Sequence, residues 1–326
     1  MGDGNSNAII IVTAVFLGLS LVAVCLRCFV RLRIVRAFGC DDALIVTAMV
    51  LNVGFAVCTF LGASSGMGKT MEYLADRPDD VRRGFFFWWL GQFFYIITVT
   101  IGRLSIAITL LRLTVERIHT WILYAVMVLS TAVGIVFLFV SIFQCQPVSY
   151  YWNLLWMEGH CLDMDARLGI VYMYSGVAAT CDFTMGILPV FLIWRLQMDR
   201  RTKVAVAGIL GIACIASAAV IVRIPFLSSA KSPDFLHATT QISIWSNIEA
   251  SLGITAGSLA TVRPIIRMWS RTTTATPSQH SLFATYPITG KRRGTADSRD
   301  DANSHSTYAS HTAQPQWVPQ MTDAFP

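Results

Sequence analysis

Residues Phe85 to Leu111 read FFFWWLGQFFYIITVTIGRLSIAITLL, an almost uninterrupted apolar run. A helix of this length, at about 1.5 Å per residue, is long enough to cross the hydrocarbon core of a bilayer. Its one charged side chain is Arg103, and an arginine at this depth is too costly to face lipid. We therefore expect Arg103 to point toward other helices and to find an acceptor there, which implies a helical bundle.

The composition of the whole chain is that of a membrane protein. Of its 326 residues, 54% are hydrophobic and 13% are charged, with a mean hydropathy of +0.57, which is unusual for a soluble domain. The net charge of +6 does not indicate nucleic-acid binding, because the arginines lie beside apolar stretches and form no separate basic domain. We expect a multi-pass protein of the plasma membrane or an endomembrane, with the lipid bilayer as its surroundings.

Seven apolar stretches are long enough to span a bilayer. They cover residues 8–30, 42–61, 85–111, 121–143, 168–194, 204–227 and 238–262. We predict an all-α membrane protein in which residues 1–269 form one seven-transmembrane helix bundle. Residues 270–326 are rich in Ser and Thr and are predicted to be a disordered cytoplasmic tail.

The basic residues of the short loops predict which way the bundle faces. They concentrate in the first, third and fifth loops and after the last span, beginning at Arg31, Arg112, Arg195 and Arg263. By the positive-inside rule these loops lie in the cytoplasm. The second loop, which contains Lys69 and three arginines, disagrees with this assignment. We still predict that the N-terminus is outside.

Four charged side chains lie well inside the expected spans: Arg103, Asp182, Arg223 and Glu249. From the helical rise, Asp182 and Glu249 lie roughly 18 to 20 Å from the cytoplasmic ends of their helices and Arg103 roughly 13 Å. Arg103 and Asp182 are therefore the expected pair, and Arg223 could reach inward to Glu249. Such charges either contact a ligand or lock helices together, and both interpretations stay open at this point.

The fourth loop reads FQCQPVSYYWNLLWMEGHCLD. On the outer, oxidising side a disulfide between Cys145 and Cys161 is expected, because the loop that it closes is short. This bond would hold Tyr151, Trp152 and Trp156 over the mouth of the bundle. These aromatic residues are then either a lid on a binding cavity or members of the interfacial aromatic belt.

No catalytic motif, metal site or cofactor site is evident. The chain has four lysines, all in loops or in the tail: Lys69, Lys203, Lys231 and Lys291. A retinal Schiff base needs a lysine in the apolar core, so covalent retinal is excluded. The adjacent carboxylates of Asp41 and Asp42 stand directly before the second span, where N-capping of the helix is the role that we expect of them.

Five motifs carry a family resemblance. They are FGCDDALIV at 38–46, GRLSIAITLLRL at 102–113, FQCQPVSYYW at 143–152 closing at Cys161, CDFTMGILPVFLIWRLQM at 181–198, and IWSNIEASLGI followed by TVRP. In their order and spacing the chain resembles the fungal rhodopsin-domain family, whose seven-helix members are similar to G-protein-coupled receptors and occur in secondary-metabolite gene clusters. The resemblance reaches Trp269 and implies the fold. Family members usually carry lysine at the position of Arg103. Arginine differs from lysine in that its planar guanidinium group presents several N–H donors in a fixed geometry.

The function that we predict is that of a receptor-like sensor of a small molecule. Its buried charges would set two packing states of the bundle, and the inner loops would present the change to a cytoplasmic signalling protein. One alternative is a transporter or exporter of a secondary metabolite, although no internal repeat supports it. Another is a membrane-embedded enzyme of cyclase or isomerase type that uses Asp182 or Glu249 as a general acid, although no catalytic motif favours an enzyme.

Overall fold

A computed structural model describes residues 3–69, 76–114, 116–154, 156–194 and 239–261, together with four isolated positions between 211 and 222. The described residues form six long α-helices and four short elements. The helices are α1 (Asp3–Phe29), α2 (Cys40–Ser64), α4 (Pro78–Leu113), α5 (Arg117–Ile142), α6 (Met164–Trp194) and α9 (Thr240–Ala260). The short elements are the π-helical segment η1 (Val30–Val35), the 3-10 turn η2 (Val148–Tyr151), and the strands β1 (Cys145–Gln146) and β2 (His160–Cys161).

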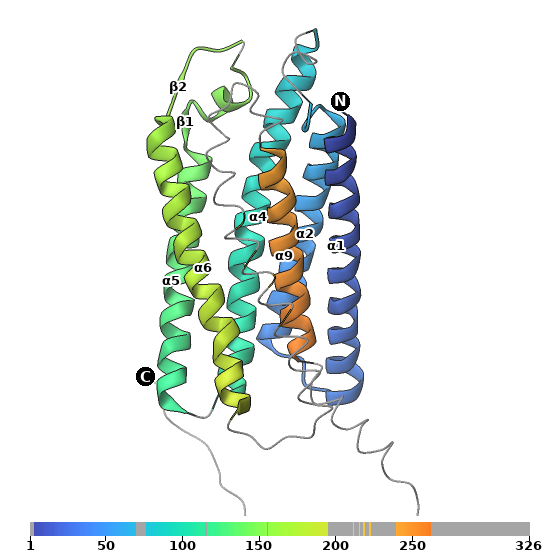
Figure 1. Ribbon diagram of the computed structural model, residues 1–326, viewed down its shortest axis with the longest axis vertical. Helices are drawn as coiled ribbons and strands as arrows, with labels where there is room; N and C mark the ends of the chain where they lie inside the picture. Colours follow the sequence, from blue (N-terminus) through green and yellow to red (C-terminus); the bar gives the residue numbers. More distant parts are fainter. Residues whose placement is uncertain are drawn as a thin grey trace, which may run out of the picture. The chain divides into compact units, whose positions relative to one another are not determined.

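The helices run side by side as a bundle (Figure 1). Helix α4 contacts α2, α5, α6 and α9, whereas α1 packs on α2 and α9, and α5 packs on α6. Strands β1 and β2 pair at the end of the bundle where α1 begins, which we call the disulfide end. The opposite end, where α1 leads through η1 toward the start of α2, we call the arginine end.

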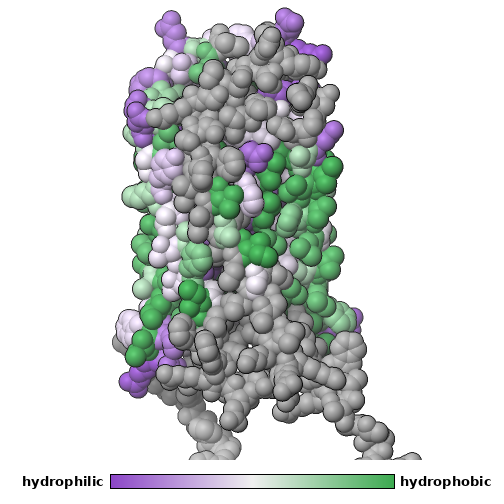
Figure 2. Space-filling model, viewed as in Figure 1, coloured by the Kyte–Doolittle hydropathy of each residue, from purple (hydrophilic) through white to green (hydrophobic). Residues whose placement is uncertain are grey.

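Four of the described helices are long and apolar enough to cross a membrane: Ser6–Val35, Cys40–Ser64, Pro78–Arg112 and Arg117–Ile142. Their outward faces expose large apolar side chains, for example Val22, Val50 and Val128, each at least 66% exposed. Figure 2 shows hydrophobic residues over the middle of the helices and hydrophilic residues toward both ends. This pattern suits a lipid surrounding, and the all-α membrane fold expected from the sequence is confirmed.

Helices α6 and α9 are not among these four candidates, although each is long enough to span. In α9 the polar residues face inward, because Ser243, Asn247, Glu249, Ser251 and Thr255 are all buried. A polar stripe that is turned toward other helices needs no contact with lipid. These polar residues lower the mean hydropathy of α9 without excluding a transmembrane position.

The expected spans before residue 194 and the span at 238–262 each coincide with a helix. The expected span 204–227 lies outside the described residues except for four isolated helical positions, and the tail 270–326 lies outside them entirely. The total of seven helices, the outward N-terminus and the disordered tail therefore stay predictions.

The loop between α5 and α6 is closed by the expected disulfide. Cys145 and Cys161 are bonded to each other and face each other in the antiparallel pair of β1 and β2. Cys145 is buried and belongs to an apolar cluster with Ile9 of α1, Ala63 of α2 and Trp88 of α4. The disulfide thus fixes the loop against the ends of α1, α2 and α4.

Small residues let α4 approach its neighbours closely. A Cβ atom added at Gly257 on α9 would lie 2.7 Å from Cγ1 of Ile106 on α4, and one added at Gly134 on α5 would lie 2.5 Å from Oγ1 of Thr100. By contrast, no atom of the described residues lies within 4 Å of a Cβ atom added at Gly253, one turn earlier on α9. Close contact through small residues is the usual basis of helix packing in membranes.

We predict that Gly257→Ala destabilises the protein and that Gly253→Ala does not. Overpacking of a filled interface typically costs about 1–3 kcal/mol, whereas an alanine in open space leaves the packing unchanged. The measurement is the midpoint of thermal unfolding of both variants in detergent. Equal midpoints for the two variants would contradict the close approach of α9 to α4.

Candidate functional site

Three charged side chains from three helices, two of them buried and Asp182 partly buried, form what we call the charge triad: Arg103, Asp182 and Glu249. Arg103 on α4 donates from Nε to Asp182 Oδ1 at 2.7 Å and from Nη2 to Asp182 Oδ2 at 2.8 Å. The same Nη2 donates to Glu249 Oε1 on α9 at 3.1 Å. The side chains of Arg103 and Glu249 are 6% and 4% exposed, so these contacts are shielded from solvent. One side chain therefore joins α4, α6 and α9.

The structure brings together the pair expected from depth, Arg103 and Asp182. It also brings Glu249 to the same guanidinium, a contact that the sequence did not indicate. Arg223, which could reach inward to Glu249 according to the sequence, lies outside the described residues. Arginine suits this position because its planar fork serves two carboxylates at once, whereas a lysine offers a single point charge.

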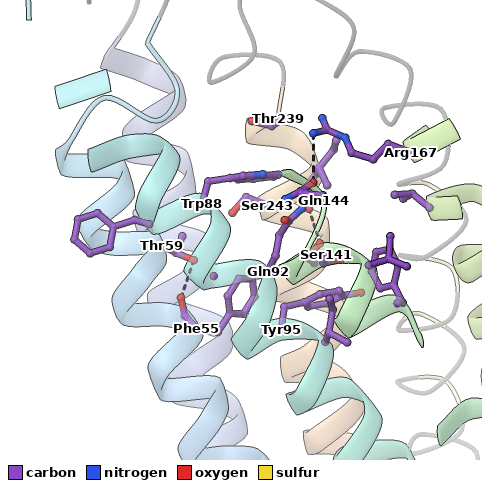
Figure 3. A pocket seen from close by; sticks show the side chains of 18 of the residues that line it. Phe55, Thr59, Trp88, Gln92, Tyr95, Ser141, Gln144, Arg167, Thr239 and Ser243 are labelled. Atoms are coloured by element: carbon purple, nitrogen blue, oxygen red, sulfur yellow. Dashed lines mark hydrogen bonds between the residues drawn. The ribbon is translucent and has the colours of Figure 1, made fainter. Parts of the chain in front are cut away.

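A cavity of about 110 Å³ lies among α2, α4, α5, α6 and α9, toward the disulfide end from the charge triad (Figure 3). Its wall is mainly apolar and aromatic, with Phe55, Trp88, Tyr95 and Phe137 among its members. A concave apolar site with a few polar groups is the usual form of a small-molecule pocket. This cavity is therefore the candidate binding site.

Tyr95 connects the cavity to the charge triad. Its ring lines the cavity and packs on Phe55, with ring centroids 5.7 Å apart. Its hydroxyl donates to Glu249 Oε2 at 2.7 Å. Glu249 thus accepts from Tyr95 with one oxygen and from Arg103 with the other, so Tyr95 links the cavity wall to the triad directly.

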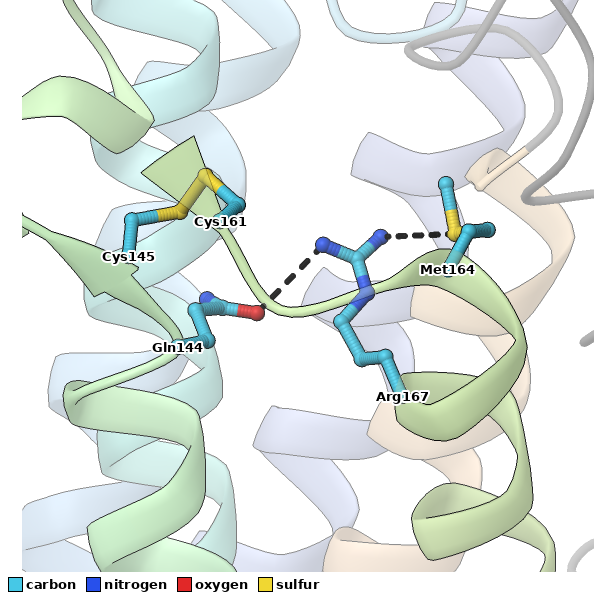
Figure 4. The surroundings of a disulfide bond; sticks show 5 residues. All are labelled: Gln144, Cys145, Cys161, Met164 and Arg167. Carbon is cyan, nitrogen blue, oxygen red and sulfur yellow. Dashed lines mark hydrogen bonds between the residues drawn. A yellow bond between two sulfur atoms is a disulfide. The ribbon is translucent and has the colours of Figure 1, made fainter. Parts of the chain in front are cut away.

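Polar groups lie in the cavity wall near the disulfide loop (Figures 3 and 4). Arg167 of α6 donates from Nη1 to Gln144 Oε1 at 3.4 Å and from Nη2 to Met164 Sδ at 3.5 Å. Within the described part of the chain, Gln144 Nε2 and Gln92 Oε1 are buried atoms with no hydrogen-bond partner. Both glutamines are among the residues that line the cavity.

The aromatic residues of the fourth loop pack beside α4 and do not line the cavity. Tyr151 is buried with its ring 6.0 Å from that of Phe85, and burial raises the pKa of Tyr151 to about 12. Trp152 lies 5.2 Å from Trp89 between ring centroids. Trp156 is half exposed. These contacts pack the fourth loop against the disulfide end of α4. That the three residues form a lid over the cavity stays a proposal.

A second group of charges, at the arginine end, was missed by the sequence reasoning. Arg27 of α1 donates from Nε to Asp42 Oδ1 at 2.7 Å and from Nη2 to Asp41 Oδ2 at 2.8 Å. Its Nη1 donates to the carbonyl oxygen of Gly257 on α9 at 2.8 Å. Arg31 and Arg112 also pair with these aspartates, which are fully buried. We call these three arginines and two aspartates the arginine-end cluster.

Only Asp42 has the capping role that we expected. Its Oδ2 accepts from the backbone N–H of Gly39, the residue at the N-cap of α2, at 3.0 Å. Asp41 instead pairs with Arg27 and with Arg112, whose Nη1 lies 2.8 Å from Asp41 Oδ1. The signal that could have revealed this cluster is Arg27 itself, an arginine inside the first apolar run that needs an acceptor for the same reason as Arg103.

The sequence profile of the fungal rhodopsin domain matches residues 26–268, about three quarters of the chain. The protein belongs to the fungal rhodopsin-domain family. Three relatives show how far the likeness extends within the family. A SAT4 family membrane protein of Emericella nidulans is 28% identical over 171 residues, which cover 50% of this chain and only 43% of that relative. No solved structure matches the chain.

The other two relatives of this family member are matched over more of their length. The polyenoic acids biosynthesis gene cluster protein Ba17b of Metarhizium anisopliae is 23% identical over 78% of this chain and 72% of its own. The wortmanamides biosynthesis cluster protein C of Talaromyces wortmannii is 25% identical over 97% of this chain and 85% of its own. The family thus includes proteins named for biosynthetic gene clusters.

For the arginine-end cluster we predict that Arg27→Ala strongly reduces stability. The substitution leaves Asp41 and Asp42 buried without their shared partner on α1, and breaking a buried ion pair costs about 3–5 kcal/mol. Thermal unfolding in detergent measures the effect, with Arg33→Ala on the exposed side of η1 as the control, which should change the stability by less than about 0.5 kcal/mol. Similar small effects of both substitutions would contradict the structural role of Arg27.

Proposed function

We propose that this member of the fungal rhodopsin-domain family is a receptor-like sensor, which binds a small molecule in the cavity and transmits the binding to the charge triad. The observation that supports this most is the double role of Tyr95, which lines the cavity and donates to Glu249 at 2.7 Å. The names of two relatives, which refer to biosynthetic clusters, support an organic metabolite as the ligand.

The transmission follows from the contacts of Glu249. A ligand that displaces the Tyr95 ring also displaces its hydroxyl and weakens the bond to Glu249. Glu249 then shifts relative to Arg103, which remains held by two bonds to Asp182. A ligand changes the populations of two packing states only if it binds one of them more tightly than the other. In this proposal the position of the Tyr95 ring differs between the two states of the triad, so the affinity of the cavity for the ligand differs as well.

The arginine-end cluster would carry the change to the other end of the bundle. Arg27 bonds to Gly257 on α9, two turns beyond Glu249, and to Asp41, whose backbone carbonyl accepts from Ser105 Oγ on α4 at 2.7 Å. A shift of α9 against α4 therefore alters the contacts of Arg27. In the predicted orientation this end faces the cytoplasm, where a signalling protein would bind.

The alternative functions fit the geometry less well. The contacts of Arg103 with Asp182 and Glu249 lie on the arginine-end side of the cavity, so a carrier would have to break them in each transport cycle. Flux of a substrate into vesicles would reveal such transport. An enzyme that uses Asp182 or Glu249 as a general acid would need that carboxylate in the cavity. Among the described residues, no carboxylate lines the cavity, and both acids bind Arg103 instead.

The proposal predicts that filling the cavity changes the arginine end. Ser243 on α9 lines the cavity, so Ser243→Phe should act as a built-in ligand. A fluorine label on Cys40, an exposed thiol at the start of α2, reports on the arginine end by NMR once the other free cysteines are replaced by alanine. We expect Ser243→Phe to change the relative areas of the label's resonances by at least twofold, and Tyr95→Phe to abolish that change.

Two controls make this result interpretable. Thr180→Phe introduces the same side chain at an exposed position of α6 and should leave the resonances of the label unchanged. Gel filtration establishes that each variant is folded before the spectra are compared. If the spectrum of folded Ser243→Phe equals that of the unsubstituted protein, the cavity is not coupled to the arginine end and the sensor proposal is wrong.

A further inference from the structure

We infer that the connection between α1 and α2 binds the headgroup of an anionic phospholipid through the side chains of Arg33 and Arg36. We call residues 30–39, which lie at the arginine end of the bundle, the α1–α2 segment (Figure 1). Three observations support this binding: the level of the segment in the membrane, the charge of its arginines and the exposure of its apolar side chains. None of its residues lines the cavity, so its proposed role does not depend on the sensor function.

The lengths of the flanking spans place the α1–α2 segment at the level of the lipid headgroups. The candidate span Ser6–Val35 has 30 residues, and the next candidate span begins at Cys40. At about 1.5 Å per residue, the first span is about 45 Å long, which matches the thickness of a bilayer with its headgroups. The chain therefore turns back into the bilayer directly after Val35, within reach of the headgroup phosphates.

Arg33 and Arg36 are exposed and have no acidic partner within the described part of the chain. Neither side chain makes an ion pair or a hydrogen bond with another described residue. The acidic residues nearest to them in the sequence, Asp41 and Asp42, are buried and paired within the arginine-end cluster. That cluster has three arginines for two aspartates, so it adds positive charge to this end of the bundle. An anion is therefore the complementary partner of Arg33 and Arg36.

The α1–α2 segment has a defined conformation that presents these arginines. Arg31 donates from Nη1 to the carbonyl oxygen of Ala37 at 3.4 Å, and the backbone N–H of Ala37 donates to the carbonyl oxygen of Arg31 at 3.2 Å. Arg31 is also paired with Asp41 at 3.4 Å. Arg36 ends η1 in the left-handed region, with a φ of 51°. An ordered backbone reduces the entropy that is lost when a partner binds.

Large apolar side chains lie between and beside the two arginines, and they favour a lipid over a soluble anion. Leu32, Ile34, Val35 and Phe38 are between 44% and 57% exposed. Basic and apolar side chains in one exposed segment are typical of the membrane interface, where the apolar groups reach the acyl chains and the charges stay among the phosphates. A phospholipid satisfies both kinds of side chain in one molecule. An acidic peptide would satisfy the arginines alone.

The chemistry of the headgroup decides which phospholipid is preferred. A guanidinium presents two parallel N–H donors that match two oxygens of a phosphate. Phosphatidylcholine carries a quaternary ammonium cation beside its phosphate, which repels an arginine, whereas phosphatidylglycerol carries none. Each arginine near an anionic membrane surface contributes about fivefold in affinity. Two arginines therefore give a clear preference for the anionic lipid.

The test compares dioleoyl phosphatidylglycerol with dioleoyl phosphatidylcholine, which share their acyl chains and differ in headgroup charge. The full chain in detergent is mixed with equal amounts of the two lipids, and native mass spectrometry measures the ratio of the two lipid-bound forms. We expect at least fivefold more phosphatidylglycerol to be bound. The combined substitution Arg33→Gln and Arg36→Gln should lower this preference at least threefold, and Arg33→Lys with Arg36→Lys should retain most of it.

Arg83→Gln is the matched control, because Arg83 is exposed on α4 at the disulfide end and has no ion pair among the described residues. It should leave the preference unchanged. If Arg83→Gln lowers the preference as much as the combined substitution does, the preference reflects net charge alone and the inference is wrong. Either glutamine substitution alone should lower the preference as well, which decides the result if the combined variant does not fold.

Two further outcomes separate a lipid from other partners. Glycerol phosphate has the phosphate without the acyl chains, and at the concentration of the lipids it should not displace bound phosphatidylglycerol. Displacement would show a site for free phosphate and would overturn the inference. Equal binding of the two lipids by the unsubstituted protein would overturn it in favour of an acidic protein segment as the partner of Arg33 and Arg36. An unchanged preference in the combined variant would also contradict it.

Discussion

An arginine that is buried in a membrane bundle must be paired within the protein, and this constraint on Arg103 organises the structure. The guanidinium makes two bonds to Asp182 and one to Glu249, so a single side chain fixes three helices relative to one another. The same constraint applies to Arg27, which binds the carboxylates of Asp41 and Asp42 on α2 and the backbone carbonyl of Gly257 on α9. Helix α9 takes part in both, through the side chain of Glu249 and the backbone carbonyl of Gly257.

The sequence predicted those features that depend on lipid as a solvent. Long apolar runs, the inward direction of Arg103 and its pairing with Asp182 all follow from the cost of polar groups in hydrocarbon and from the helical rise. The disulfide between Cys145 and Cys161 followed from the short loop and its predicted compartment. The sequence placed Glu249 at a depth similar to that of Asp182 but did not predict its contact with Arg103. Depth along a helix does not determine the direction in which a side chain points around the helix axis.

The cavity and the arginine-end cluster could not be predicted in the same way. The cavity wall comes from five helices, and Arg167 and Gln144 meet there only because α5 and α6 are paired. In the sequence, Arg167 counted only as a loop charge in the assignment of orientation. Asp41 and Asp42 had a sufficient local explanation as capping residues, which hid the buried pairing of both with Arg27. A contact between residues far apart in the sequence leaves no local sequence pattern, and it is missed when a local role such as helix capping already accounts for the residues.

The central claim is that Arg103 and Asp182 stabilise the bundle as a pair and not as two independent polar residues. A double-mutant cycle tests it most directly, with unfolding free energies in detergent for Arg103→Met, Asp182→Leu and the combination of both. The account predicts a coupling energy of about 0.5–3 kcal/mol, because the second substitution removes the charge that the first one left unpaired. Additive effects, with the double variant losing the sum of the two single losses, would contradict it.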